Sequence, residues 1–486
     1  MMNISSIRIK KIRKISFMLA VLIFSTPLTV YGSIPLTAPS AILIDQNSGK
    51  VLYAHNEHER MYPAGLAKMM TALVVLDHLN PDDVIVVGTE IYQVPPGAIR
   101  AGHQSGEHIT VRNLLRGLMI RNGNDSGNVL AQHTVQTIRG QTGIPFVHVE
   151  NIFSGLMIEK ARELGANNTS FTNPNGLHHD SLYTTAYDMA LIARAFMQVP
   201  LLRNIVAELE YVGDGMEGRE VYGARILNYN WVNDNELMIS GSTYYYTYAT
   251  GIRRGSTPQA SDCLAASAER NGVRLIAIIF DSPDPGRWLD ARMLFDYGFD
   301  TYSYHTLLES GQHIQTAFVY NARRGEDNIL DVRVNEDFAA LLSQRELSRI
   351  RQEIVFYERF LAPVDLNEEG YYESYFENHF EYADIASTVL IAPIEENEVL
   401  GTITFTLDGN ALFIAELHAT REVPERTIDS DMDYIIAWVQ NNVFSLSAWP
   451  YWIALAGTLF GFLGMSLWIN ERRRGKKSSS YSGTYR

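Results

Sequence analysis

The stretch Pro63-Ala64-Gly65-Leu66-Ala67-Lys68-Met69-Met70-Thr71 decides how this chain folds. It follows a predicted β-hairpin and opens an apolar helix that we expect over residues 66–78. Gly65 and Lys68 are three residues apart, so they share one face of the first helical turn. A serine at position 65 would set a hydroxyl beside the lysine amine, the arrangement of a nucleophile and its general base. Glycine stands there instead, so the spacing is present and the nucleophile is missing.

Two further polar segments lie later in the chain. Asn122-Gly123-Asn124-Asp125 falls between an expected helix over 111–119 and another from residue 129. Loops held by rigid elements often carry chemistry, although these residues also suit an ordinary helix cap and turn. Arg253-Arg254-Gly255 precedes two expected antiparallel strands, 263–268 and 273–280, with an Asn-Gly turn between them. The chemistry of the chain therefore centres on three short segments.

Together these segments resemble the three active-site motifs of the serine-type D-alanyl-D-alanine carboxypeptidases, the low-molecular-mass penicillin-binding proteins. The first motif, Ser-x-x-Lys, reads Gly65-Leu66-Ala67-Lys68 here. The second, Ser-x-Asn, reads Asn122-Gly123-Asn124, and the third, Lys-Thr-Gly, reads Arg253-Arg254-Gly255. Lys68, Asn124 and Gly255 match, and Arg253 keeps the positive charge. Gly65, Asn122 and Arg254 depart from the family pattern.

The resemblance covers about residues 38 to 420 and implies both fold and roles. It implies an α/β sandwich of the β-lactamase/transpeptidase type with a helical subdomain, followed by a small β domain. In active relatives the serine forms an acyl-enzyme with the D-Ala-D-Ala peptide, and water then releases the stem peptide. Lys68, Asn122 and Asn124 occupy the catalytic positions. Arg253, Arg254 and Gly255 occupy those that bind the ligand's carboxylate.

The missing hydroxyl at Gly65 shapes the functional expectation. Removing a nucleophile that acts within a unit usually costs several orders of magnitude in rate. We therefore expect a non-catalytic relative that binds peptidoglycan peptide or a cell-envelope protein. Lys68, Arg253 and Arg254 are expected to form a basic pocket that holds a carboxylate, with an acid such as Asp125 relieving their repulsion.

Two alternatives to this expectation stay open. The chain could be a carboxypeptidase working by an unorthodox route, such as a lysine-activated water, or a structural wall-proximal module without a small ligand. No metal or nucleotide motif is present in the sequence, so no cofactor is expected.

The two ends of the chain predict export and anchoring. Residues 1–32, with five basic residues before an apolar run, predict a signal peptide, and an uncleaved anchor is the alternative. A second apolar run, 449–469, predicts a transmembrane helix, and its basic flank, 470–486, predicts a cytoplasmic tail. A carboxypeptidase-like domain over 38–304 and a β domain over 310–425 are then expected outside the membrane.

Charge and composition exclude some partners. The net charge is −15, and leaving out the basic leader and tail puts about −25 on the exported part, which repels nucleic acid and anionic lipid. The single cysteine, Cys263, allows no intrachain disulfide and is expected in the core. The tyrosine-rich run 244–248 is expected as a strand, with sugar stacking as the alternative. Residues 339–344 are expected as a short helix, and the acidic, aromatic segment 366–382 as an insertion.

Overall fold

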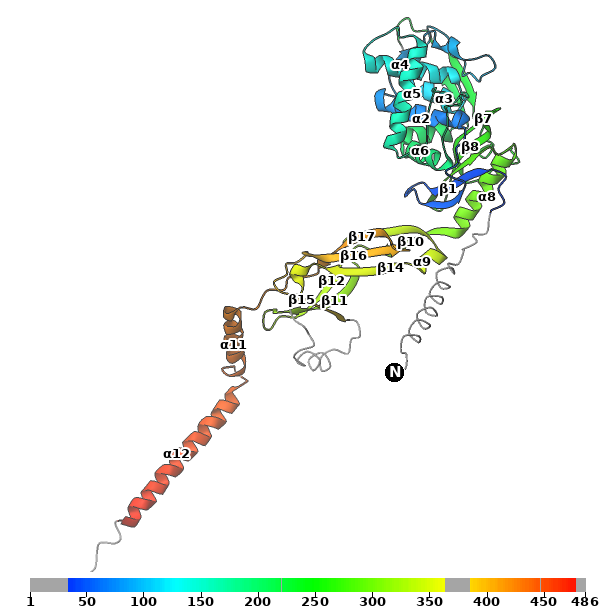
Figure 1. Cartoon of the computed structure of the whole chain (residues 1–486). Helices are drawn as coiled ribbons and strands as arrows, with labels where there is room; N and C mark the ends of the chain where they lie inside the picture. Colours follow the sequence, from blue (N-terminus) through cyan, green and yellow to red (C-terminus); the bar gives the residue numbers. More distant parts are fainter. Residues whose placement is uncertain (1–33, 220, 363–384, 446, 478–486) are drawn as a thin grey trace, which may run out of the picture. The chain divides into compact units, whose positions relative to one another are not determined.

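The computed structural model describes residues 34–219, 221–362, 385–445 and 447–477 (Figure 1). The predicted signal peptide and the acidic insertion lie outside these ranges. The chain divides into two compact units, the first ending at Ser303 and the second beginning at Tyr304. Each unit has its own apolar core.

An antiparallel five-stranded sheet in the order β2-β1-β9-β8-β7 forms the frame of the first unit. Its central strand β9, with the sequence VRLIAIIF, is buried along nearly its whole length. A strand that is apolar on both faces requires cover on both sides of the sheet. The strands are β1 (Ser40–Asp45), β2 (Val51–His55), β7 (Ala249–Thr257), β8 (Ser261–Arg270) and β9 (Val273–Phe280).

Helices supply that cover, and neighbouring residues of β1 show that it is two-sided. The closing helix α8 approaches Leu43, since a Cβ added at Gly298 would lie 2.8 Å from its side chain. Ile42 and Ile44 instead belong to the core cluster formed with the helical subdomain. The helices of this unit are η1 (Ala64–Ala67), α2 (Lys68–His78), η2 (Glu90–Gln93), α3 (Val111–Met119), α4 (Asn124–Arg139), α5 (Phe146–Glu163), α6 (Ala186–Gln198), α7 (Pro200–Ala207) and α8 (Gly286–Thr301).

Two small hairpins complete the first unit. Strand β3 (Val84–Val86) pairs with β4 (His108–Thr110), which leads directly into α3. Strand β5 (Glu210–Asp214) pairs with β6 (Asn228–Val232) in a region that the sequence left without an assignment. Helices α3 and α6 begin at threonine caps, because Thr110 and Thr185 accept hydrogen bonds from backbone N–H groups in the first turn.

The second unit is mainly β-structure, as expected. A six-stranded sheet runs in the order β14-β16-β17-β12-β11-β15, and β10 pairs with β13. Its elements are β10 (Tyr302–Leu308), β11 (His313–Tyr320), β12 (Ile329–Arg333), β13 (Phe338–Ser343), α9 (Gln344–Leu347), β14 (Arg351–Phe356), η3 (Glu358–Phe360), β15 (Ile385–Ile391), β16 (Val399–Leu407), β17 (Asn410–Ala419), α11 (Ile428–Asn442) and α12 (Trp449–Lys477).

Two local expectations were wrong. Residues 339–344 form most of strand β13, and a helix starts only at Gln344, because Ser343 closes a capping box with Glu346. The tyrosine run 244–248 consists of turns, and its Tyr246 is tied down by a 2.9 Å hydrogen bond from its hydroxyl to Asp296. Tertiary contacts at these places outweigh local propensity.

Helix α12 carries the second apolar run. Its stretch Trp449–Arg473 is long and apolar enough to cross a membrane. It is the single unbroken helix of this kind among the described residues. Arg472 follows the apolar stretch and lies with its guanidinium carbon 4.0 Å from the ring centre of Trp468, which pairs a cation with an aromatic ring at this end of the helix.

Candidate functional site

The site begins where η1 passes into α2. All residues from Ala64 to Val75 are buried, so this helix start lies inside the unit rather than on its surface. Ala64 has a φ of +46°, a backbone conformation that L-residues rarely adopt and that often marks functional sites. The short 3-10 turn that follows sets Gly65 and Lys68 on one side of the chain.

Lys68 is the centre of a fully bonded polar cluster. Its side chain is 2% exposed. Its Nζ donates to Asn122 Oδ1 at 3.0 Å, to Asn124 Oδ1 at 2.7 Å and to the backbone oxygen of Asn175 at 2.9 Å. Burial, reinforced by the charge of Arg253, lowers the pKa of Lys68 well below its ordinary value. The three oxygens act in the opposite sense, because they hydrogen-bond the charged form.

The two asparagines come from the junction of α3 and α4. Asn122 has a φ of +65°, which asparagine tolerates better than most residues, and Asn124 is the first residue of α4. The next residue, Asp125, accepts hydrogen bonds from the backbone N–H groups of Ala101, Gly102 and His103 at 2.7–3.1 Å. These bonds fix the start of α4, and with it the side chain that meets Lys68.

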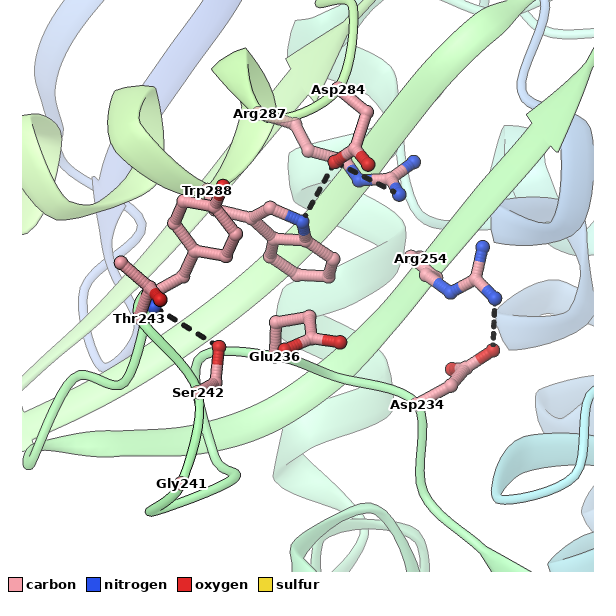
Figure 2. A pocket seen from close by; sticks show the side chains of 10 residues that line it. Asp234, Glu236, Gly241, Ser242, Thr243, Arg254, Asp284, Arg287 and Trp288 are labelled. Atoms are coloured by element: carbon pink, nitrogen blue, oxygen red, sulfur yellow. Dashed lines mark hydrogen bonds and ion pairs between the residues drawn. The ribbon is translucent and has the colours of Figure 1, made fainter.

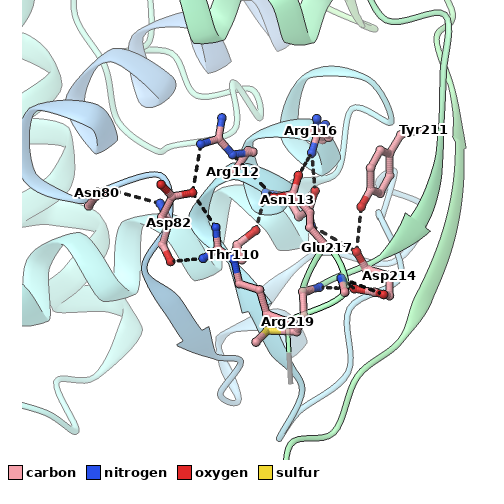
Figure 3. Close-up of polar contacts among 12 residues, drawn as sticks. Asn80, Asp82, Thr110, Arg112, Asn113, Arg116, Tyr211, Asp214, Glu217 and Arg219 are labelled. Atoms are coloured by element: carbon pink, nitrogen blue, oxygen red, sulfur yellow. Dashed lines mark hydrogen bonds and ion pairs between the residues drawn. The ribbon is translucent and has the colours of Figure 1, made fainter. Parts of the chain in front are cut away.

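An ion-pair network holds α3 from the other side (Figure 3). Arg116 pairs with Glu208 at 3.1 Å and also with Glu217. Arg112 pairs with Asp82 at 3.0 Å. These contacts tie α3 both to the chain before it and to the segment around the β5–β6 hairpin, so the end of α3 that carries Asn122 is well positioned.

Gly65 faces an open position for a side chain. A Cβ added there would lie 3.4 Å from the backbone oxygen of Arg254, 3.4 Å from Gly255 Cα and 3.5 Å from Asn122 Oδ1. These are ordinary van der Waals distances, so a small side chain fits. Gly65 has no such atom, and the place beside Lys68 where a nucleophile would stand holds no hydroxyl.

Two other glycines keep the surroundings of Gly65 close-packed. A Cβ at Gly176 would lie 1.8 Å from the backbone oxygen of Ala64, and one at Gly255 would lie 2.7 Å from the Gly65 nitrogen. Gly176 also has a φ of +75°. Backbones can approach this closely only where both positions lack a Cβ. The shape of the site around residue 65 is therefore maintained by glycines on two other segments.

Neighbouring arginines on β7 point to different environments. Arg253 is 3% exposed and donates from Nη1 to the backbone oxygens of Leu118 and Met119, at 2.9 and 3.0 Å. It thus binds the carbonyl end of α3, where a cation is favoured. Burial lowers the pKa of Arg253 to about 10.

Arg254 pairs instead with Asp234 at 2.8 Å, and their side chains keep 28% and 34% of their exposure (Figure 2). Both residues line a pocket of about 460 Å³ that also includes Glu236, Tyr244 and Trp288. Arg287 lies in the same wall, but it is 5% exposed and pairs with Asp262. The pocket therefore mixes acids, arginines and aromatic rings.

The structure brings some predicted site residues together and separates others. Lys68, Asn122 and Asn124 meet, and the backbone of β7 passes close to Gly65 at Arg254 and Gly255. The basic pocket differs from the prediction, because Arg253 is committed to α3 carbonyls and Arg254 to an acid. That acid is Asp234. Asp125 binds backbone N–H groups, and its negative charge still favours the charged form of Lys68, as predicted.

Two contributors were missed from the sequence. The three motifs do not include the segment around Asn175, yet its carbonyl binds Lys68. The turn sequence Pro174-Asn175-Gly176 was the available signal. Asp234 gave no signal, because its partner lies twenty residues away on another element.

Comparison with known proteins identifies the family. The family model described as D-alanyl-D-alanine carboxypeptidase matches residues 29–284, more than half of the chain. The carboxypeptidase DacF of Bacillus subtilis (strain 168) is 29% identical over 338 residues, covering 68% of this chain and 79% of that protein. DacA of Escherichia coli (strain K12) is 27% identical over 412 residues, covering 82% of this chain and 86% of that protein.

Solved structures agree on the fold. Penicillin binding protein 5 from Haemophilus influenzae superimposes with a TM-score of 0.55 at 24% identity, over 81% of this chain and 99% of that one. The carboxypeptidase DacD from Francisella tularensis gives 0.53 at 21% identity, over 81% and 95%. These matches confirm the expected fold. The family model, which matches more than half of the chain, shows in addition that the chain belongs to the D-alanyl-D-alanine carboxypeptidase family.

Proposed function

We propose that this chain is a non-catalytic member of its family that holds the carboxyl end of a peptidoglycan stem peptide. One observation carries the proposal: the cluster around Lys68 is complete, while the adjoining position at Gly65 has space for a side chain but no hydroxyl. A family serine would stand at that position. Without it no acyl-enzyme can form there, because the bond-forming oxygen is absent.

The partly exposed arginine of strand β7 supports a binding role. Arg254 is partly exposed at the edge of a pocket, and a guanidinium can hold a carboxylate through two parallel hydrogen bonds. Its backbone oxygen lies 3.4 Å from the Cβ position of residue 65, so the strand passes close to where a scissile peptide would lie. The proposed roles are therefore orientation by Lys68, Asn122 and Asn124, and carboxylate contact by Arg254.

The proposal extends to location. The relatives are carboxypeptidases, and α12 is suited to cross a membrane. We propose that α12 anchors the chain with both units on the outer side and the basic tail inside. Cysteine accessibility of an added tail residue in intact cells would test this topology.

The binding test uses the full chain in detergent and an N-acylated tripeptide ending in D-Ala-D-Ala. We expect saturable binding without release of D-alanine, and about three-fold weaker binding for Arg254→Gln, since a partly exposed charge-assisted contact is lost. Arg270→Gln, which breaks a comparable pair with Asp300 at 2.7 Å, is the matched control. Released D-alanine would restore the enzyme alternative, and absence of binding would favour a protein partner.

A further inference from the structure

Asp234 is held in place by its two neighbours. It follows β6 by two residues, between Asn233 and Asn235, which are 5% and 0% exposed. The Asn233 side chain donates to the backbone oxygens of Val206 and Glu208, and both asparagines accept N–H groups from the following turn. The backbone on either side of Asp234 is thus fixed, and its carboxylate is presented from a rigid loop.

That carboxylate faces the cations of the site. It contacts Arg254 directly at 2.8 Å. Burial is the main influence on Lys68 and Arg253 and lowers the pKa of both. At Lys68 the negative charges of Asp125 and then Asp234 oppose that lowering, and at Arg253 the charge of Asp234 does so. Among the described residues, Asp234 is therefore the one acid of the site that acts on Lys68, Arg253 and Arg254 alike. The carboxylate of a bound peptide would be attracted to the position that the Asp234 carboxylate now occupies.

The pocket around the pair is large enough for such a ligand. It measures about 460 Å³, and its other arginine, Arg287, is buried and paired with Asp262 and Asp284 (Figure 2). Arg254 and Asp234 retain about a third of their exposure, so an incoming anion can reach the guanidinium from the pocket.

We propose that Asp234 is a built-in competitor for the ligand's carboxylate, so that a peptide terminus engages Arg254 only by taking the place of Asp234. This inference rests on the proposed binding function and adds the residue that sets its strength and selectivity. Exchange of one carboxylate for another keeps the guanidinium paired in both states. The net gain on binding is then small, and the native chain binds carboxylate ligands weakly.

The test compares Asp234→Asn with the unmodified full chain in detergent. The probes are the N-acylated D-Ala-D-Ala tripeptide and its C-terminal amide. Asp234→Asn keeps the side-chain shape and removes the competing charge, so we expect about five-fold tighter binding of the free acid, the worth of a partly exposed ion pair. The amide should change by less than about two-fold on the same scale.

Two further variants test whether the gain in affinity comes from freeing Arg254 or from removing any negative charge. Asp284→Asn removes one negative charge from the same pocket without touching the Arg254 pair, and Asp300→Asn breaks an ion pair elsewhere in the unit. The gain should be largest for Asp234→Asn and should vanish in Asp234→Asn/Arg254→Gln.

The outcomes distinguish the two proposals. An equal gain in Asp284→Asn, an equal gain for the amide, or no gain at all in a chain that does bind would overturn the competitor and leave the binding function standing. Binding by Asp234→Asn alone would support the competitor and remove the function from the native chain. No binding by either would count against both.

Discussion

The two walls of the site differ in what their charged side chains bind. On the helical wall, Lys68, Asn122 and Asn124 keep a bonded cluster in which each donor of the lysine has an acceptor. On the strand wall, Arg253 binds the end of α3 and Arg254 binds an acid of its own chain. The difference shows that the shape of a site and its chemistry are held by different groups. Backbone packing at Gly176 and Gly255 preserves the shape even though residue 65 has no side chain.

The sharpest challenge to this comparison is Gly65→Ser. If the helical wall is intact, the added hydroxyl lies beside Lys68, and penicillin should acylate it at least about 10³-fold faster than it modifies the unmodified chain, the usual scale for a nucleophile within a unit. Intact-mass analysis would show the adduct. Gly65→Ala, which adds the Cβ alone, should stay unmodified. An adduct on the unmodified chain would reveal another nucleophile, and none on Gly65→Ser would mean that the strand wall blocks the site.

The pH profile of the same reaction tests Lys68 as the base. The proton from the serine can be accepted only by the neutral amine, so acylation is slow below the pKa of Lys68 and fast above it. Because burial lowers this pKa, the rate of Gly65→Ser should rise with pH and level off well below the ordinary lysine value of 10.5. A half-maximal pH at or above 10.5 would exclude this role, and adding Lys68→Arg should abolish the plateau.

The next prediction addresses what preserves the shape of the site. Gly176→Ala places a Cβ 1.8 Å from the Ala64 oxygen, so we expect the free energy of unfolding to fall by about 3 kcal/mol or more. Gly218→Ala is the matched control, because Gly218 has the same φ of +75° with nothing within 4 Å of its added Cβ. It should cost only about 1 kcal/mol, from the left-handed backbone alone. Equal losses in urea unfolding would show that the close approach to η1 does not matter.

The last prediction, with the smallest expected effect, compares how much Arg253 and Arg254 contribute to the free energy of unfolding. Arg253→Ala leaves two buried carbonyls of α3 without their charged donor, so the free energy of unfolding should fall by about 2–4 kcal/mol. Arg254→Ala removes a partly exposed pair and should cost about 1 kcal/mol or less. Equal effects in urea unfolding would contradict the division into a structural and an accessible arginine.

The sequence predicted the family, the fold and the helical wall, because these depend on local spacing. Gly65 to Lys68 is one turn of helix, and Val111–Met119 is a helix with the predicted bounds. The strand wall could not be predicted. That Arg253 faces α3 and Arg254 faces Asp234 depends on contacts between segments far apart in the chain. The tyrosine run 244–248 was wrong because Tyr246 bonds to the distant Asp296. Residues 339–343 were wrong because they pair with β10, while the capping box of Ser343 and Glu346 delays the helix start to Gln344.

The proposed membrane anchoring by helix α12 would raise the occupancy of a site that binds its ligand weakly. A chain held at a membrane searches two dimensions rather than three, and a polymeric wall offers the same peptide end many times over. Under these conditions the effective local concentration, not the dissociation constant of one contact, determines occupancy. An acid that competes with the ligand at Arg254 then favours rapid release and rebinding. Under the proposed anchoring and binding, such a chain would hold one peptide end at a time, release it quickly and bind the next.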